Sequence, residues 1–160
     1  MQSPKHGQVS IQDVVRIICE RVQDDSHEYQ VVVGTDSQNF DKTKVVVVIA
    51  LHDLGHGGIF FYDILHVKRI NTVGEKLIFE TQKSLEYAQE FMNELDRYCK
   101  ETGFEYLQHF KFSIHVDAGM NGPSKNVIPE IVGWIKSAGY NVAVKPDSFA
   151  ACSIADKLSK

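Results

Sequence analysis

The sequence has 160 residues, a length that suits one domain with a hydrophobic core. Apolar residues make up 43% and charged residues 24%, and no apolar run approaches the roughly 20 residues that span a bilayer, so we expect no membrane partner. The net charge of −4 gives no support for tight, nonspecific binding of nucleic acid by the molecule as a whole. A polyanionic ligand would therefore need a local basic patch or metal ions.

The N-terminal residues and the cysteines bear on the cellular compartment. Residues 1–10 contain no apolar segment of the kind found in a secretory signal. The three cysteines (Cys19, Cys99 and Cys152) are scattered and form no CxxC pair. This pattern argues against a disulfide framework and against a thiolate zinc site, and it favours a reducing cytosol. We therefore expect a cytoplasmic protein.

The first half of the chain predicts one helix followed by three strands. Residues 10–23 place apolar side chains at helical spacing, with Ser10 in the N-cap position. Strand chemistry follows at 29–36, 44–52 and 58–67. The connectors between these strands are short and rich in turn formers, so the sequence predicts consecutive hairpins in an antiparallel meander.

The second half predicts helices alternating with strands. A long helix is expected over 73–102, ended by Gly103. After it come a strand, a helix, a short strand and a last helix, at 110–119, 125–137, 140–145 and from Pro146–Asp147 to the end. A crossover helix returns the chain to the same edge of a sheet, so these later strands should pair in parallel. The prediction is a mixed sheet in an α/β fold, with helices on both faces.

Two aspartates lie where apolar strands end. Asp36 follows "VVVGT" and Asp117 follows "FSIHV", and a small residue comes after each. Each could be a turn or cap residue, because aspartate is common there. If the two strands are neighbours, however, both carboxylates meet at one edge, where their repulsion requires a shared proton or a bound cation. A hard divalent ion with oxygen ligands would serve.

Three further acids are candidates for the same site. Glu80 borders the core-facing stripe of the long helix, although it could also lie at the flank, paired with Lys76 or Lys83. Asp147 has the position of a helix N-cap. Asp156 lies in a mainly apolar last helix that has few other acids. Glu80 could therefore supply a third ligand, and Asp147 and Asp156 are the acids of the final segment.

The histidines give weaker signals. His52 and His56 are four residues apart but flank a turn, so zinc ligation by that pair is disfavoured. His115 precedes Asp117 by two residues and should point to the same face of its strand. It could assist proton transfer, but a hydrogen-bonded, half-buried histidine is the simpler interpretation.

Candidate substrate contacts lie around the acids. Ser124 and Lys125 open a helix after a glycine-rich loop, a geometry that holds phosphate, although the spacing is not that of a P-loop. Lys145 either contacts a scissile phosphate or neutralises Asp147. Ser37, next to the first aspartate, completes this set. Lys68 and Arg69 form the best short basic pair for a nucleic-acid backbone.

Four segments together resemble a known fold. They are "GTDSQ" at 34–38, "KLIFETQKSLEYA" at 76–88, "HVDAG" at 115–119 and "KPDSFAACSIADKLSK" at 145–160. In this order they resemble the ribonuclease H-like superfamily, and most closely its uncharacterised bacterial YkuK-type family. The resemblance covers nearly the whole chain from about Tyr29. It implies a five-stranded sheet of order βββαβαβα in a single domain over 1–160, with 1–28 as an N-terminal helical extension.

The resemblance also implies a metal site. In that superfamily acids on the first strand, the first helix, the fourth strand and near the last helix bind two divalent metals. By resemblance these are Asp36, Glu80, Asp117 and either Asp156 or Asp147. Asp156 is favoured because "ADKL" is similar to the superfamily's final acidic helix. Two Mg²⁺ or Mn²⁺ ions about 3.5–4 Å apart would activate water and stabilise the leaving oxygen.

Two functions follow from this resemblance. The first is a metal-dependent nuclease that hydrolyses phosphodiester bonds in RNA, DNA or a hybrid. The alternative is a non-catalytic ribonuclease H-like module that binds nucleic acid or a protein partner, which the acidic net charge and the few basic residues favour. A nucleotide-dependent phosphotransferase is disfavoured because its glycine-rich phosphate loop is missing from the sequence. The sequence gives no signal for an oligomeric state.

Overall fold

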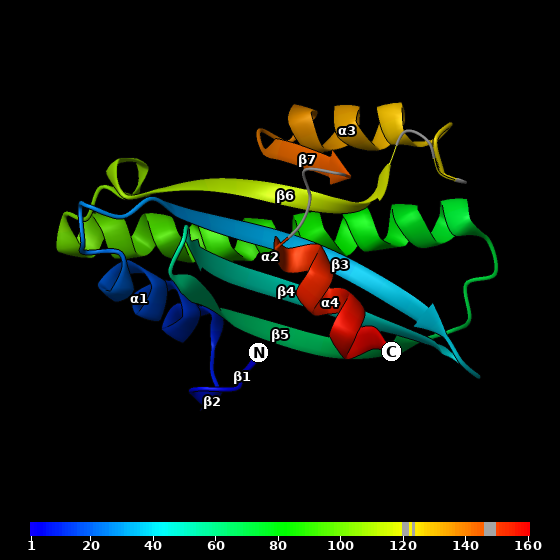
Figure 1. Cartoon of the computed structure of the whole chain (residues 1–160), viewed down its shortest axis with the longest axis horizontal. Helices are drawn as coiled ribbons and strands as arrows, with labels where there is room; N and C mark the ends of the chain where they lie inside the picture. Colours follow the sequence, from blue (N-terminus) through cyan, green and yellow to red (C-terminus); the bar gives the residue numbers. More distant parts are fainter. Residues whose placement is uncertain (120–121, 123, 146–149) are drawn as a thin grey trace.

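The computed structural model describes residues 1–119, 122, 124–145 and 150–160, without the side chains of 150–153. Its main elements are α1 (Ile11–Arg21), β3 (Tyr29–Asn39), β4 (Thr43–Asp53), β5 (Gly57–Val67), α2 (Val73–Thr102), β6 (Phe110–Gly119), α3 (Ile128–Ser137), β7 (Asn141–Lys145) and α4 (Ala150–Ser159). Three short elements complete the described chain: β1 (Gln2–Ser3), β2 (Gly7–Gln8) and the 3₁₀ turn η1 (Tyr106–Gln108). Figure 1 shows the strands as one twisted sheet between helices.

The sheet is mixed and has the order β2-β1-β5-β4-β3-β6-β7. β3, β4 and β5 pair antiparallel along their full lengths, which confirms the predicted meander. β6 is parallel to β3, and β7 is parallel to β6, as the alternation of helices and strands predicts. The mixed α/β fold with its five main strands is therefore confirmed. The sequence did not predict β1 and β2, because two residues are too few for an alternating pattern.

Helices cover both faces of the sheet, and this explains the unbroken apolar runs of its central strands. Val31 and Val33 of β3 pack in the cluster that contains α1, α2 and α3. Val32 of β3 faces the other way, with Val46 and Val48 of β4, against Ala155 of α4. A strand buried on both faces carries valine at successive positions and does not alternate with polar residues. The same alternation directs Asp36 toward α4.

Local capping sets the ends of the two helices that precede and follow the meander. Ser10 caps α1 as predicted, in a reciprocal capping box with Asp13. Thr72 caps α2 by accepting a hydrogen bond from the Glu75 amide at 3.2 Å. α2 ends as predicted at Gly103, whose φ of 76° is left-handed. Within the described part of the chain, no helix combines the length and the apolar character needed to cross a bilayer.

The later helices differ slightly from their predicted ranges. α3 begins at Ile128, three residues after the predicted start at Lys125. Residues 124–127 form a turn instead, in which the Val127 amide donates to the Ser124 carbonyl at 2.9 Å. The predicted entrance of the last helix, Pro146–Asp147, lies outside the described residues.

Candidate metal site at the ends of β3 and β6

Asp36 and Asp117 lie just beyond the point where β3 and β6 stop pairing. β3 does not end at Asp36 as predicted, because it continues to Asn39 in its ladder with β4. The last recorded pair of this parallel ladder is Gly34 with His115. Two more residues in the same register would place Asp36 directly opposite Asp117. β6 is also irregular here, because four residue steps from His115 to Gly119 match two steps on β7. A bulge bends a strand and redirects its side chains. The ladder between β3 and β6 thus opens next to the carboxylates of Asp36 and Asp117. We call Asp36, Glu80, Asp117 and Asp156 the carboxylate site.

Asp36 is the buried member of the site, with 7% of its surface exposed. The hydroxyl of Ser159, at the end of α4, donates a hydrogen bond of 2.9 Å to its carboxylate. Burial raises the pKa of Asp36, the Ser159 hydrogen bond lowers it, and the charge of Asp117 raises it again. The negative charge of Asp156 also raises this pKa. The charges of two other members of the site, Asp117 and Asp156, therefore affect the pKa of Asp36.

Glu80 reaches the site from α2, on the opposite face of the sheet from α4. Its pKa lies well above the usual value for glutamate, first because of burial and next because of the Asp36 charge. Lys76 lowers this pKa, and Asp117 raises it. The other lysine that the sequence offered as a partner, Lys83, instead forms an ion pair of 3.0 Å with Glu86. Glu80 is only partly exposed, and the charge that affects its pKa most is that of another acid, Asp36.

Two lysines accompany the remaining acids. Lys145 Nζ lies 2.9 Å from Asp117 Oδ1, and 18% of the Asp117 side chain is exposed. Lys160 Nζ lies 3.1 Å from Asp156 Oδ2, one helical turn away. Lys145 was expected to contact phosphate or to neutralise Asp147, and the structure pairs it with Asp117. Asp147, the alternative fourth acid, lies outside the described residues.

The donor set fits a hard divalent cation. All four members offer carboxylate oxygen, the ligand that Mg²⁺ and Mn²⁺ prefer. The pKa values of Asp36 and Glu80 are raised partly because neighbouring acids repel their ionised forms, and a bound cation would remove that repulsion. The members are not packed as tightly as ligands of one ion. Among the residues that the structure describes, the group of three ligand atoms within 4.8 Å of one another is elsewhere, at His27, Asp53 and His56.

The structure places Ser37 and the pair of Ser124 and Lys125 on different elements, β3 and the turn before α3. Ser37 is buried on the α2 face, close enough to Glu80 to lower its pKa, although its hydroxyl makes no regular hydrogen bond within the described chain. Ser124 is buried and Lys125 exposed in the turn before α3. That turn lies beside the start of α2, since a Cβ at Gly74 would be 3.9 Å from Val127.

His115 is more buried than expected, with 4% of its surface exposed. Burial lowers its pKa to about 4, so the imidazole is neutral near pH 7. A neutral ring adds no positive charge beside Asp117. The predicted half-buried histidine is therefore fully buried, and its predicted hydrogen bond stays a prediction.

Sequence reasoning missed Ser159 as a member of this site. Its hydroxyl is fully buried, and Lys44 Nζ, which donates to the Leu158 carbonyl at 2.7 Å, holds the same end of α4 in place. No local signal marked it, because Ser159 is separated from Asp36 by 123 residues. The spacing of Asp156 and Ser159, three residues apart on one helix, could have suggested that both face the same neighbour.

Comparisons with known proteins identify the family. The family model described as "Ribonuclease H-like" matches residues 13–160. The chain belongs to the ribonuclease H-like family. It is also similar to the protein named "Uncharacterized protein YkuK" of Bacillus subtilis (strain 168), with 34% identity over 162 residues, 96% of this chain and 93% of the relative. The resemblance to the ribonuclease H-like superfamily and the closer resemblance to the YkuK-type family are therefore both confirmed.

One solved structure is also similar. It is described as "Structure of Mos1 transposase catalytic domain and Raltegravir with Mg", with 17% sequence identity over 94% of this chain and 71% of the other. The TM-score is 0.34, a value too low to support any conclusion about this site.

Proposed function

We propose that this protein is a divalent-metal-dependent nuclease that hydrolyses phosphodiester bonds in RNA or DNA. Asp36, Glu80 and Asp117 would hold two Mg²⁺ or Mn²⁺ ions, with Asp156 or Asp147 as the fourth acid. The observation that supports this most is the crowding of acids around Asp36 and Glu80, whose raised pKa values record burial and mutual repulsion. Membership of the ribonuclease H-like family supports the same proposal.

The residues in and around the carboxylate site have separate roles in this proposal. Bound ions would supply an activated water and stabilise the leaving oxygen. Asp36 is positioned by Ser159 and carries the central negative charge. The ion pair between Asp117 and Lys145 would be released if Asp117 held a metal ion, and the Lys145 ammonium group could then contact a substrate phosphate. Ser37 presents a hydroxyl beside Glu80.

Nucleic acid is the proposed partner, and the basic pair of Lys68 and Arg69 supports it. The Arg69 guanidinium donates to the Phe40 carbonyl, so the pair lies beside the β3–β4 hairpin. The Asn39 side chain donates to the Ile70 carbonyl at 2.8 Å and holds this segment near the end of β3. Both basic residues are exposed and lie at the same end of the sheet as Asp36. They could contact a phosphate backbone that enters the carboxylate site.

The test is a cleavage assay on labelled RNA, DNA and RNA–DNA hybrid, each single-stranded or duplex where possible, with Mg²⁺ or Mn²⁺. The wild-type chain should cleave at least one substrate, and the Glu80→Gln variant should not. Glu86→Gln is the matched control, because it makes the same change on an exposed position of the same helix. Glu86→Gln should keep wild-type activity.

Two results would overturn the nuclease proposal. One is wild-type protein that leaves every substrate intact with both metals. The other is cleavage that survives in Glu80→Gln, which would indicate a contaminating nuclease. Binding of nucleic acid without cleavage would favour the alternative, a non-catalytic module on the same fold.

A further inference from the structure

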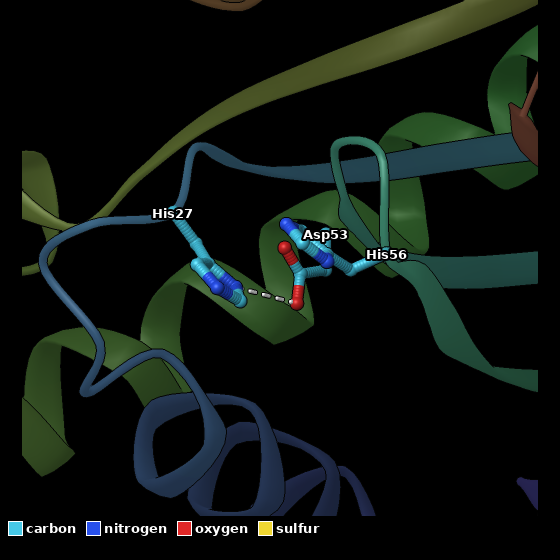
Figure 2. Close-up of side chains that lie close together, drawn as sticks. All are labelled: His27, Asp53 and His56. Atoms are coloured by element: carbon cyan, nitrogen blue, oxygen red, sulfur yellow. Dashed lines mark hydrogen bonds and ion pairs between the residues drawn. The ribbon is translucent and has the colours of Figure 1, made fainter.

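A second group of metal-ligating side chains lies at the other end of the central strands. His27 precedes β3, Asp53 ends β4, and His56 lies in the turn between β4 and β5. One ligand atom of each lies within 4.8 Å of the other two. Figure 2 shows the three side chains close together, with His27 on one segment and Asp53 and His56 on another. We call these three residues the histidine cluster.

The backbone fixes the two loops against each other. The His56 amide donates to the Asp53 carbonyl at 2.8 Å and closes the β4–β5 turn. Gly55 and Gly57, with φ of 80° and 91°, take left-handed conformations that this turn needs. The Leu54 amide then donates to the Glu28 carbonyl at 3.0 Å, which ties the turn to the loop that carries His27.

The side chains are arranged around a carboxylate with an unused oxygen. His27 Nδ1 lies 3.0 Å from Asp53 Oδ2, and the rings of His27 and His56 stack with centroids 4.1 Å apart. The other carboxylate oxygen, Asp53 Oδ1, is buried and has no hydrogen-bond partner among the described residues. An acceptor buried in this way is costly unless a cation or a donor satisfies it. The cluster thus offers two imidazoles and an orphaned carboxylate oxygen.

We propose that the histidine cluster is a binding site for a zinc-class divalent transition metal. Two histidines and one carboxylate with an open fourth position form a ligand set that Zn²⁺ takes in proteins. Bonds of about 2.0–2.1 Å in a tetrahedron separate ligand atoms by about 3.3–3.4 Å, so small side-chain rotations would bring the three atoms from their present spacing into place. The stacked rings must tilt for both nitrogens to face one ion.

Asp24 would support the ion as a partner of His27. Its carboxylate oxygen lies 3.4 Å from His27 Nε2, the ring nitrogen on the far side from Asp53. When Nδ1 binds the metal, Nε2–H donates to Asp24. A carboxylate behind a ligating histidine fixes the ring and strengthens its metal bond.

This site is distinct from the carboxylate site. Asp53 pairs with Tyr29, which is seven residues from Asp36 along β3, so the two sites are roughly 23 Å apart. The ligands here include nitrogen, whereas the proposed ligands there are all oxygen. A metal at the histidine cluster would link the loop before β3 to the β4–β5 turn and take no part in phosphodiester cleavage.

The test is calorimetric titration of the metal-free chain with Zn²⁺, followed by Co²⁺ absorption spectroscopy of the same proteins. The wild type should bind one Zn²⁺ at this site and give Co²⁺ bands typical of low coordination number. His56→Gln and His27→Gln should each weaken binding by more than about 10-fold, and Asp24→Asn by about 10-fold. His56 is exposed, so its replacement should leave the fold intact, which circular dichroism without metal checks.

Two controls separate this site from others. His66→Gln, an exposed histidine of β5 at the far end, should bind Zn²⁺ as the wild type does. Asp36→Asn removes the central acid of the carboxylate site and should also keep this Zn²⁺ affinity. Equal binding by wild type and a folded His27→Gln/His56→Gln double variant, or no binding by the wild type, would overturn the proposal. In either case the His27–Asp53 contact would be a structural hydrogen bond alone.

Discussion

The two ends of the β3–β4 pair carry two different groups of metal-ligating side chains. At the carboxylate site, Asp36 has acidic neighbours, and burial together with their charges raises its pKa. At the histidine cluster, Asp53 has an imidazole as its nearest partner, at 3.0 Å. The first group offers hard oxygen ligands, and the second offers nitrogen and oxygen. The two proposed sites at the ends of this strand pair therefore differ in the class of metal ion that their ligands would favour.

Backbone geometry explains this difference. At the carboxylate site the sheet opens, because β3 and β6 stop pairing after Gly34 and His115 and β6 is irregular. At the histidine cluster β3 and β4 stay paired up to Tyr29 and Asp53, and His27 and His56 come from the loops beyond this last pair. An opening in the sheet suits a substrate that must enter, whereas a closed loop pair suits a stabilising ion.

The largest expected effect is on catalysis and separates the two ends sharply. Asp36→Asn should lower metal-dependent cleavage by more than about 100-fold, because loss of a direct ligand exceeds the 10–100-fold effect of outer-shell partners. His56→Gln should change cleavage by less than about 2-fold, since the histidine cluster lies far from the reaction. Rates measured side by side on one substrate check this contrast. Similar losses in both variants would mean that the two ends are not independent.

The next largest expected effect is the change of folding stability with pH in the metal-free chain, caused by the acids of the carboxylate site. The folded-state pKa values of Asp36 and Glu80 lie above the ordinary values of 3.8 and 4.5. Their contribution to stability is therefore present below these ordinary values and is lost as pH rises through the raised folded-state values. The loss has a slope of up to about 1.4 kcal/mol per pH unit for each group.

Urea unfolding of the metal-free chain at several pH values measures this slope. Glu80→Gln should flatten it above pH 4.5, and Glu86→Gln should leave it unchanged. Mn²⁺ at pH 7 should stabilise the wild type more than Glu80→Gln, because only the wild type retains the full ligand set. A slope of the same size in all three proteins would contradict the described crowding of acids.

Ser159→Ala should have a smaller effect. Its hydroxyl donates to the buried Asp36 carboxylate, and a hydrogen bond to a charged group contributes about 1.5–3 kcal/mol. The free energy of unfolding should fall by that amount at neutral pH, and the pKa of Asp36 should rise further. Ser137→Ala is the matched control, because that hydroxyl is exposed and bonds only to its own helix. Equal losses of unfolding free energy in both variants would mean that Ser159 does not position Asp36.

Lys145→Gln should have the smallest effect on stability. Its side chain is 57% exposed, and exposed ion pairs contribute about 0–1 kcal/mol. Mn²⁺ affinity should rise slightly, because the ammonium group no longer competes for Asp117. Calorimetry checks the affinity, and weaker Mn²⁺ binding in this variant would mean that Lys145 holds Asp117 in its metal-binding position.

Local physics explains why most of the fold could be predicted from the sequence. The valine runs of β3 and β4, the cap at Ser10 and the stop at Gly103 are short-range signals, and the structure agrees with each. β1 and β2 could not be predicted, because they form by pairing with β5 and with each other, and their own residues have no strand pattern.

The same difference between short-range signals and long-range contacts explains which site residues could be predicted from the sequence. Asp36 and Asp117 stood out because each ends an apolar strand, and the structure places both where β3 and β6 separate. Ser159 and His27 did not stand out, because their partners Asp36 and Asp53 are distant in the sequence. His56 was considered only with His52, its neighbour in sequence, whereas the fold pairs it with His27.

The central claim is that the carboxylate site holds divalent metal, and a crystal structure of the chain grown with Mn²⁺ tests it most directly. Anomalous scattering should place two ions about 3.5–4 Å apart between Asp36, Glu80 and Asp117, with Asp156 or Asp147 as the fourth ligand. The Lys145 ammonium should have left Asp117. Anomalous maps without Mn²⁺ among these carboxylates, at a concentration that supports cleavage, would contradict the account.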